Sequence, residues 1–183
     1  ILKLTNQDME SSTKEKLVDL LAANKDNITA MLKISSVRNE TLNKVCDTKL
    51  REQVQKIANE LEMDCTCSST NWCERWKGQF FFSKPEWKYF RIGFEFMGNG
   101  LTDFNYGIRY KGELEKGKTP DVKQEITRKL GGKHNEWWAS YKPFKDPNWN
   151  DDVVFEHLFD GTIKTEITNN VKELCKELEG IDL

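Results

Sequence analysis

The spacing of hydrophobic positions changes near residue 68, from a helical to a strand-like pattern. Before that point apolar residues recur every three to four positions, which is typical of one side of an α-helix. The pattern predicts a helix over about 12–23 and a second helix capped by Asp26, with Ile28, Met31 and Leu32 facing inward. A longer helical pattern follows, with apolar residues at Val37, Leu42, Val45, Val54, Ile57 and Leu61.

The segment "DCTCSSTNWCERWKG" has no helical period, and we place the domain boundary in it, between residues 68 and 69. Three strand-like runs follow: "KGQFFFS", "YFRIGFEFM" and "DFNYGIRYKG". Turn residues in "SKPEW" and "GNGLTD" separate them, and short turns between successive strands favour an antiparallel meander.

The rest of the chain alternates helical and aromatic segments. "TPDVKQEITRKLGG" predicts a helix with Thr119 as cap, Pro120 at its first position and Gly131 beyond its end. "HNEWWASYKPFKDPNW" is expected to be an aromatic loop or edge strand, and a short and a long helix close the chain. The predicted fold class is α+β: a helical arm (1–68), then a three- to four-stranded antiparallel meander sheet with C-terminal helices packed on one face (69–183). These two parts can form one compact unit.

Successive side chains of a strand point to opposite faces, so each run divides into two sets. One set is almost entirely aromatic or aliphatic and is expected to be buried under the C-terminal helices. Its members are Phe80, Phe82, Phe90, Ile92, Phe94, Phe96, Phe104, Tyr106, Ile108 and Tyr110.

The opposite set is mixed, and it provides the candidate binding residues. Gly93 and Gly107 are expected to be cross-strand neighbours that form a shallow floor, since glycine in a strand allows a ring, a ligand or another backbone to approach closely. Charged and aromatic side chains surround this floor. The candidate residues are Lys77, Phe81, Tyr89, Arg91, Gly93, Glu95, Gly107, Arg109 and Lys111, together with Trp138 from the "EWWASY" segment.

Three interpretations of this face remain open. Trp137 or Trp138 packs onto the glycine floor as ordinary core. Alternatively, the face is a groove in which Arg91, Arg109 and Lys111 meet phosphates while aromatic rings (Tyr89, Phe81, Trp138) stack on bases. The third interpretation is a protein interface, in which Trp, Tyr and Arg are the usual anchors.

Charge and reactive residues narrow the chemistry. The net charge of −2 is uneven: residues 1–73 carry −1, residues 74–142 carry +5 and residues 143–183 carry −6, so an anionic partner is expected to meet the middle third. The five cysteines lack the paired spacing of a zinc site. With only two histidines, the chain has few candidates for a histidine metal site or a Ser-His-Asp triad. We expect no cofactor, no metal and no catalytic residue in this chain.

Short nuclease-like patterns do occur. Metal-dependent nucleases hold Mg²⁺ with carboxylates and add a lysine, and "EWK" (Glu86 to Lys88) and "DVK" (Asp121 to Lys123) fit the spacing. The first lies in a proline turn and the second opens a helix, which are poor contexts for such a site. An independent enzyme that uses Glu86, Lys88 and Asp121 requires these groups to converge.

The order of several segments resembles a known family. "LTNQ" at residues 4–7, the helical arm, "FFFSKPEWKYFRIGFEF", "YGIRYKG", "EWWASYKPF", "NWNDDVVFEHLFDG" and "IKTEITNNVKELCKELEG" resemble the C-terminal region of bacterial PD-(D/E)XK nuclease superfamily proteins of uncertain role. The resemblance covers most of the chain and rests on aromatic spacing and order. It implies that the catalytic core precedes this region and that none of its metal-binding carboxylates falls on a position here.

These observations lead to one expected function and one alternative. The first is a noncatalytic accessory domain that positions DNA or RNA on the basic, aromatic sheet face. The alternative is an interaction or structural module whose helical arm docks on the parent protein's missing N-terminal core or on a second copy. The chain starts at Ile1, which suggests excision from something longer, and it has neither a membrane span nor a secretory pattern, so we expect a cytoplasmic protein.

Overall fold

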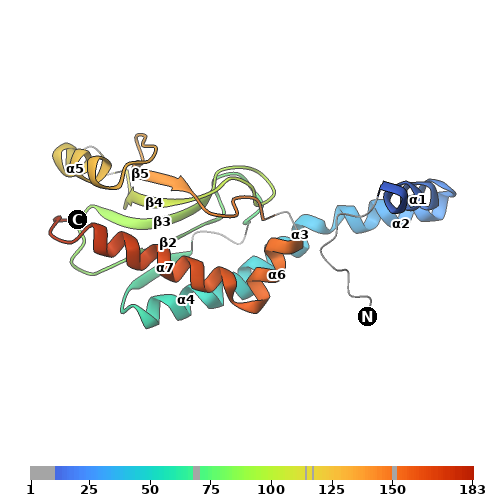
Figure 1. Ribbon diagram of the computed structural model, residues 1–183, viewed down its shortest axis with the longest axis horizontal. Coiled ribbons are helices and arrows are strands. Elements are labelled where there is room, and N and C mark those ends of the chain that lie inside the picture. Colours follow the sequence, from blue (N-terminus) through green and yellow to red (C-terminus); the bar gives the residue numbers. More distant parts are fainter. Residues whose placement is uncertain (1–10, 68–70, 114, 117, 150–151) are drawn as a thin grey trace. The chain divides into compact units, whose positions relative to one another are not determined.

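The computed structural model describes residues 11–67, 71–113, 115–116, 118–149 and 152–183 (Figure 1). The chain divides into two compact units, residues 1–42 and 43–183. The sequence places the boundary later, at 68/69. The difference arises because the helical segment over residues 43–60 buries its apolar residues within the second unit.

The first unit contains a helical hairpin of α1 (Ser11–Ala22) and α2 (Lys25–Ser36). Asn24 caps α2, because its side chain accepts a hydrogen bond of 2.9 Å from the N–H of Asn27. The expected cap, Asp26, instead lies in the first turn, where its charge favours the helix dipole. The Asn27 amide also donates to the carbonyl of Leu20 at 2.7 Å, which ties the two helices together.

None of the described side chains of this hairpin is buried. No residue from 13 to 45 is buried, and the side chains expected to face inward are exposed: 40% for Ile28, 40% for Met31 and 57% for Leu32. Two short helices have too little mutual surface to enclose a core, so the helical period was predicted correctly but the burial was not.

The longer helical pattern is confirmed over residues 38–60. It comprises α3 (Arg38–Val45), one π-helical turn η1 (Cys46–Leu50) and α4 (Arg51–Glu60). Leu50, Val54 and Ile57 are fully buried. The helical segment therefore contributes a stripe to the core of the second unit.

The second unit is built on one five-stranded antiparallel sheet in the order β1-β2-β3-β4-β5. The predicted α+β class and meander are confirmed. The three strong runs become β2 (Gln79–Ser83), β3 (Phe90–Phe96) and β4 (Phe104–Tyr110). Two edge strands complete the sheet, β1 (Asp64–Cys67) and β5 (Trp138–Pro143). β1 is the additional strand, because four residues with no apolar alternation gave too short a pattern to detect.

The aromatic face of the sheet is buried as predicted. Phe80, Phe94 and Tyr106 are cross-strand partners, and their rings stack in series with centroid separations of 4.9 and 5.6 Å. The remaining members of the predicted buried set have at most 1% of their surface exposed. Offset ring stacking therefore runs through the core perpendicular to the strands.

The helix α5 (Pro120–Leu130) lies between β4 and β5 in the chain, and α6 (Asp152–Asp160) and α7 (Thr162–Glu177) follow β5. Figure 1 shows α7 lying along one side of the sheet with α4 next to it, while α5 lies near β5. One apolar side of α7 is buried, at Ile163, Ile167, Val171 and Leu174. The aromatic face is therefore covered by helices, and the mixed face lies on the opposite side of the sheet. Among the described residues, no helix combines the length and the apolar character that a membrane span requires.

Candidate functional site

The mixed face of the sheet is assembled as the alternation predicts. Gly93 is the register partner of Gly107, and Arg91 is the partner of Arg109. Glu95 lies two residues farther along β3, on the same face as Arg91 and Gly93. Alternation thus places both arginines and the two glycines on one face, and the register of β3 with β4 makes them neighbours.

The glycine floor is filled by the chain itself. A Cβ atom on Gly93 would lie 2.9 Å from Trp138 Cη2 and 3.3 Å from a Phe81 ring carbon. A Cβ atom on Gly107 would overlap the carbonyl oxygen of Ser140 in β5. Trp138 is 2% exposed, so the interpretation in which a tryptophan packs on the floor is the one observed, and the expected hollow at the glycines is absent.

Phe81 and Arg91 form a stacked pair beside this floor. Phe81 is 4% exposed, and the Cζ atom of Arg91 lies 3.4 Å from its ring centroid. The expectation that Phe81 offers a free ring to a base is therefore wrong, because the ring is buried and Arg91 already stacks on it. Within the described residues, Arg91 has neither a carboxylate nor a hydrogen-bond partner, and its Nε atom is buried without one.

Burial and the neighbouring Arg109 charge lower the pKa of Arg91 to about 10, while Glu95 acts in the opposite direction. Arg91 is therefore charged at neutral pH. Two guanidinium groups sit side by side on this face, and one carboxylate lies close to them. The cluster has an excess of one positive charge, which an anionic ligand can neutralise.

That carboxylate belongs to Glu95, which is 3% exposed. Its Oε2 atom lies 3.3 Å from Nη1 of Arg109, which also donates to the side-chain oxygen of Gln79. Burial raises the pKa of Glu95 above its ordinary value, and the Arg109 charge and a hydrogen bond with Trp138 offset part of this effect. Intramolecular contacts with Glu95 and Gln79 thus already engage the Arg109 guanidinium.

The other expected phosphate contacts lie at the margins of the face. Lys77 precedes β2, is exposed and pairs with Glu74 at 2.7 Å. Lys111 follows β4, and its ammonium group donates to the carbonyl of Trp87. Tyr89 is half-buried, and its carbonyl accepts the N–H of Lys111 at 2.9 Å.

A cavity of about 460 Å³ opens on this face next to Arg109. Three tryptophans form much of its lining, with Glu95 among the polar groups. We call it the indole pocket, and its lining residues are Trp76, Glu95, Met97, Arg109, Asn135, Glu136, Trp137 and Trp138. Its volume falls in the range of small-molecule sites, roughly 300–1,000 Å³.

Trp76 is the most accessible ring of the indole pocket. It is 55% exposed, and its backbone φ of 61° lies in the left-handed region, which is rare for a large side chain. The backbone N–H of Trp76 donates to the carbonyl of Phe96 at 3.0 Å, and the Arg75 guanidinium lies 4.1 Å from the centroid of the Trp76 ring. The backbone is therefore held in an unfavourable conformation that leaves an indole ring at the pocket.

Trp137 lines the same pocket from the segment before β5. The Lys116 ammonium group lies 4.3 Å from the centroid of the Trp137 ring, and Lys116 also pairs with Glu136 at 2.9 Å. Asn135 fixes this segment, because its Oδ1 atom accepts the backbone N–H groups of Trp137 and Trp138 at 2.8 and 2.9 Å. The Asn135 NH₂ group has no partner in the described part of the chain.

Sequence reasoning selected three of the eight residues that line the pocket: Glu95 and Arg109 by strand alternation, and Trp138 from the "EWWASY" segment. It named Trp137 only as a ring that packs on the glycine floor, and it did not select Trp76, Met97, Asn135 and Glu136. Trp76 and Asn135 lie in loops, where alternation does not apply. The available signal was compositional: "CERWKG" places a tryptophan beside acidic and basic residues, and "HNEWW" places two beside an asparagine and a glutamate.

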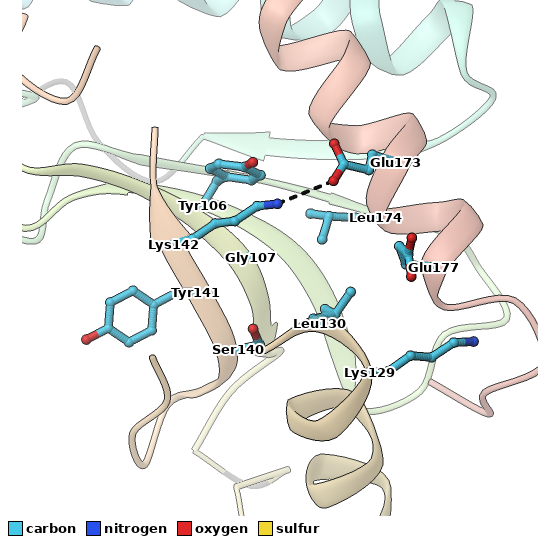
Figure 2. Close-up of a pocket in the computed structure, with 10 residues that line it drawn as sticks. All are labelled: Tyr106, Gly107, Lys129, Leu130, Ser140, Tyr141, Lys142, Glu173, Leu174 and Glu177. Atoms are coloured by element: carbon cyan, nitrogen blue, oxygen red, sulfur yellow. Dashed lines mark hydrogen bonds and ion pairs between the residues drawn. The ribbon is translucent and has the colours of Figure 1, made fainter. Parts of the chain in front are cut away.

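A smaller cavity of about 170 Å³ lies on the helical side of the sheet (Figure 2). Figure 2 shows Lys142 pointing toward Glu173 of α7, with which it pairs at 3.3 Å, while Tyr141 points away from the helix. Leu130 and Leu174 complete its apolar lining. Lys142 already has a counterion and the space is small, so this cavity is a weaker candidate.

The first unit carries an apolar groove. It is lined mainly by hydrophobic side chains of α1 and α2, among them Leu20, Leu21, Met31 and Ile34. Ile34 is 73% exposed and Leu20 is 61% exposed. Exposed apolar patches of this kind mark interaction surfaces.

The proposed enzyme residues are distributed over separate elements. Glu86 lies in the turn between β2 and β3, whereas Asp121 lies in the first turn of α5. Within the described ranges, no group of three or more His, Cys, Asp or Glu residues is placed to hold a metal ion. The five cysteines form no disulfide bond.

Comparisons with known proteins identify no relative: neither a family model, nor a curated protein, nor a solved structure matches the chain at a significant level. The relationship to PD-(D/E)XK proteins stays a prediction. Function has to be argued from the site itself.

Proposed function

We propose that the second unit binds single-stranded nucleic acid at the indole pocket and Arg91, as a noncatalytic accessory part of a nuclease-like protein. One observation carries the proposal: an accessible tryptophan pocket is lined by Arg109, and the cross-strand partner of Arg109 is Arg91, a charged arginine that lacks a counterion among the described residues. Indole rings stack on bases, and guanidinium groups bind phosphates.

The geometry favours a single strand over a duplex. Trp137, Trp138 and Met97 are among the residues that line the pocket, and a base reaches stacking contact with its rings only when it has left its own stack. Arg91 is the cross-strand neighbour of Arg109, which lines the pocket, and this places a positive charge near the entering nucleotide. The excess of basic residues in the middle third of the chain acts in the same direction.

The nuclease-like part of the proposal comes from the resemblance in segment order. The indole pocket and its charges support nucleic-acid binding independently of that resemblance. Arg109 and Lys111 play smaller roles than the sequence suggests, because Glu95, Gln79 and the Trp87 carbonyl already engage them.

The test is a titration of a fluorescently labelled 11-nucleotide single strand with the protein at low ionic strength, followed by anisotropy. We expect saturable binding that Trp76→Ala weakens about 5- to 100-fold, as befits the loss of one stacking ring. Phe159→Ala is the matched control, because Phe159 is 61% exposed on α6, away from the pocket. Absence of binding by the wild-type protein would remove the proposal, as would equal losses in the two variants.

A second candidate function is self-association through α1 and α2. No residue from 13 to 45 is buried, and a hairpin of this length cannot enclose a core alone, since units below about 40 residues usually require a partner. The described residues 13–42 carry five basic and four acidic side chains, so two copies do not repel strongly. Two hairpins can form a four-helix bundle, and we therefore propose that a second copy of this chain covers the apolar groove of α1 and α2.

Light scattering at several protein concentrations tests this candidate. A dimer that dissociates on dilution is expected. A monomer at all concentrations would overturn it.

A further inference from the structure

We infer that the indole pocket selects guanine among the bases, with Glu95 and Asn135 reading its edge. The inference rests on the proposed binding of single-stranded nucleic acid and names the base that the site prefers. It follows from which donors and acceptors face the cavity.

Glu95 supplies the acceptors. An ionised carboxylate has about four lone-pair positions on its two oxygens. Arg109 occupies one at 3.3 Å, and Trp138 forms a further hydrogen bond. Glu95 is among the residues that line the cavity, and its two oxygens have more lone-pair positions than these two partners occupy, which leaves acceptor capacity for a ligand that donates N–H groups.

Asn135 supplies the donor. Its Oδ1 atom is fixed by the backbone N–H groups of Trp137 and Trp138, which determines the orientation of the amide. The NH₂ group is consequently on the opposite side, without a partner in the described part of the chain. The pocket therefore combines a carboxylate acceptor with an amide donor.

Guanine complements this arrangement better than the other bases do. Its Watson–Crick edge carries two adjacent N–H donors, at N1 and the exocyclic N2, beside the O6 acceptor. A carboxylate accepts the two donors together, and the Asn135 amide can donate to O6. Adenine and cytosine each offer one exocyclic amino group, and thymine offers one ring N–H, so none of them provides the paired donors.

The aromatic lining adds a preference for a purine. Trp76 and Trp137 expose indole surface to the cavity, and a bicyclic base overlaps an indole more fully than a pyrimidine does. Stacking alone does not separate guanine from adenine. The edge contacts with Glu95 carry that discrimination.

The experiment compares four single strands in which five thymidines stand on each side of one central guanine, adenine, thymine or hypoxanthine. Hypoxanthine matters most, because it keeps N1–H and O6 but lacks the N2 amino group. We expect the guanine strand to bind about tenfold or more tightly than the thymine strand, with hypoxanthine between them, as for loss of one arm of a bidentate pair.

Two variants locate the preference. Glu95→Gln removes one acceptor and Asn135→Asp keeps the oxygen that fixes the segment while removing the NH₂ donors. Each is expected to reduce the guanine-to-thymine affinity ratio toward one, and the ratio is informative even if a variant changes overall affinity. Far-ultraviolet circular dichroism and thermal unfolding verify that each variant folds.

The outcomes separate the two claims. If the thymine strand binds and the central base makes no difference, the guanine inference fails while the proposed function stands. If the hypoxanthine strand binds as tightly as the guanine strand, the paired-donor contact with Glu95 is wrong. If none of the strands binds, both claims fall.

Discussion

The indole ring of Trp138 lies over the backbone of Gly93, so closely that a Cβ atom at residue 93 would stand 2.9 Å from Trp138 Cη2. Trp138 comes from an edge strand, and Gly93 lies in the central strand of the sheet. The contact joins the β5 edge to the centre of the mixed face. It also positions Trp138 as one wall of the indole pocket.

Gly93→Ala is therefore expected to lower the free energy of unfolding by about 1–3 kcal/mol, the usual effect of inserting a methyl group into packed surroundings. Chemical denaturation measures it. Gly107→Ala should cost more, because its methyl group meets the β5 backbone instead of a movable ring. In a double-mutant cycle, Trp138→Leu should reduce the cost of Gly93→Ala. Additive effects would show that the ring does not limit residue 93.

The Glu95–Arg109 pair gives a second prediction. Arg109→Met leaves the Glu95 carboxylate buried without its cation, so we expect a loss of about 3 kcal/mol at neutral pH. Glu95→Gln should cost less, because it removes the buried charge together with the ion pair. The double variant should be more stable than Arg109→Met alone. Equal stability of Arg109→Met and wild type in urea denaturation would contradict the assignment of this pair.

The raised pKa of Glu95 predicts a pH dependence. The pKa of Glu95 is raised in the native state above its ordinary value of 4.5. Between pH 4.5 and the native pKa, the native state therefore binds more protons than the unfolded chain does. The contribution of Glu95 to stability is present below pH 4.5 and is lost as pH rises through the native pKa. Glu95→Gln should remove this slope, which denaturation across that range measures. An unchanged slope in the variant would assign the effect to another group.

Guanine binding should have the opposite pH trend. Only the ionised Glu95 accepts both guanine donors, so the guanine-to-thymine affinity ratio should rise as pH passes upward through the Glu95 pKa. Measuring the ratio at two pH values on either side of the transition tests this. A ratio that does not vary with pH would separate the preference from Glu95 ionisation.

The hairpin of the first unit yields another prediction. Ile34 is 73% exposed and lines the apolar groove, so Ile34→Glu should weaken self-association at least tenfold by placing a charge there. Thr13→Glu, at an exposed polar position of α1, is the control. Sedimentation equilibrium measures both. If the two variants dimerise equally, the groove is not the contact.

Strand alternation accounts for what could be predicted from sequence. It placed Gly93, Gly107, Arg91 and Arg109 on one face, because side-chain direction in a strand depends only on residue parity. Which residues pair across the strands depends on the register of β3 and β4, which alternation does not determine. It could not show that Arg91 stacks on Phe81 or that Trp138 covers Gly93, since those contacts depend on how β5 joins the sheet. Trp76 and Asn135 were missed because loop geometry fixes them: a left-handed backbone in one case and two backbone hydrogen bonds in the other.

The salt dependence of single-strand binding by wild-type protein and by Arg91→Gln tests the proposed site most directly. Lys176→Gln serves as the charge-matched control, because Lys176 is exposed on α7, on the helical side of the sheet. We predict that wild-type affinity falls steeply with salt and that Arg91→Gln lowers both the affinity and the salt slope, the slope by about one, while Lys176→Gln changes neither. Wild-type affinity that is insensitive to salt, or identical slopes for Arg91→Gln and Lys176→Gln, would contradict phosphate binding at Arg91.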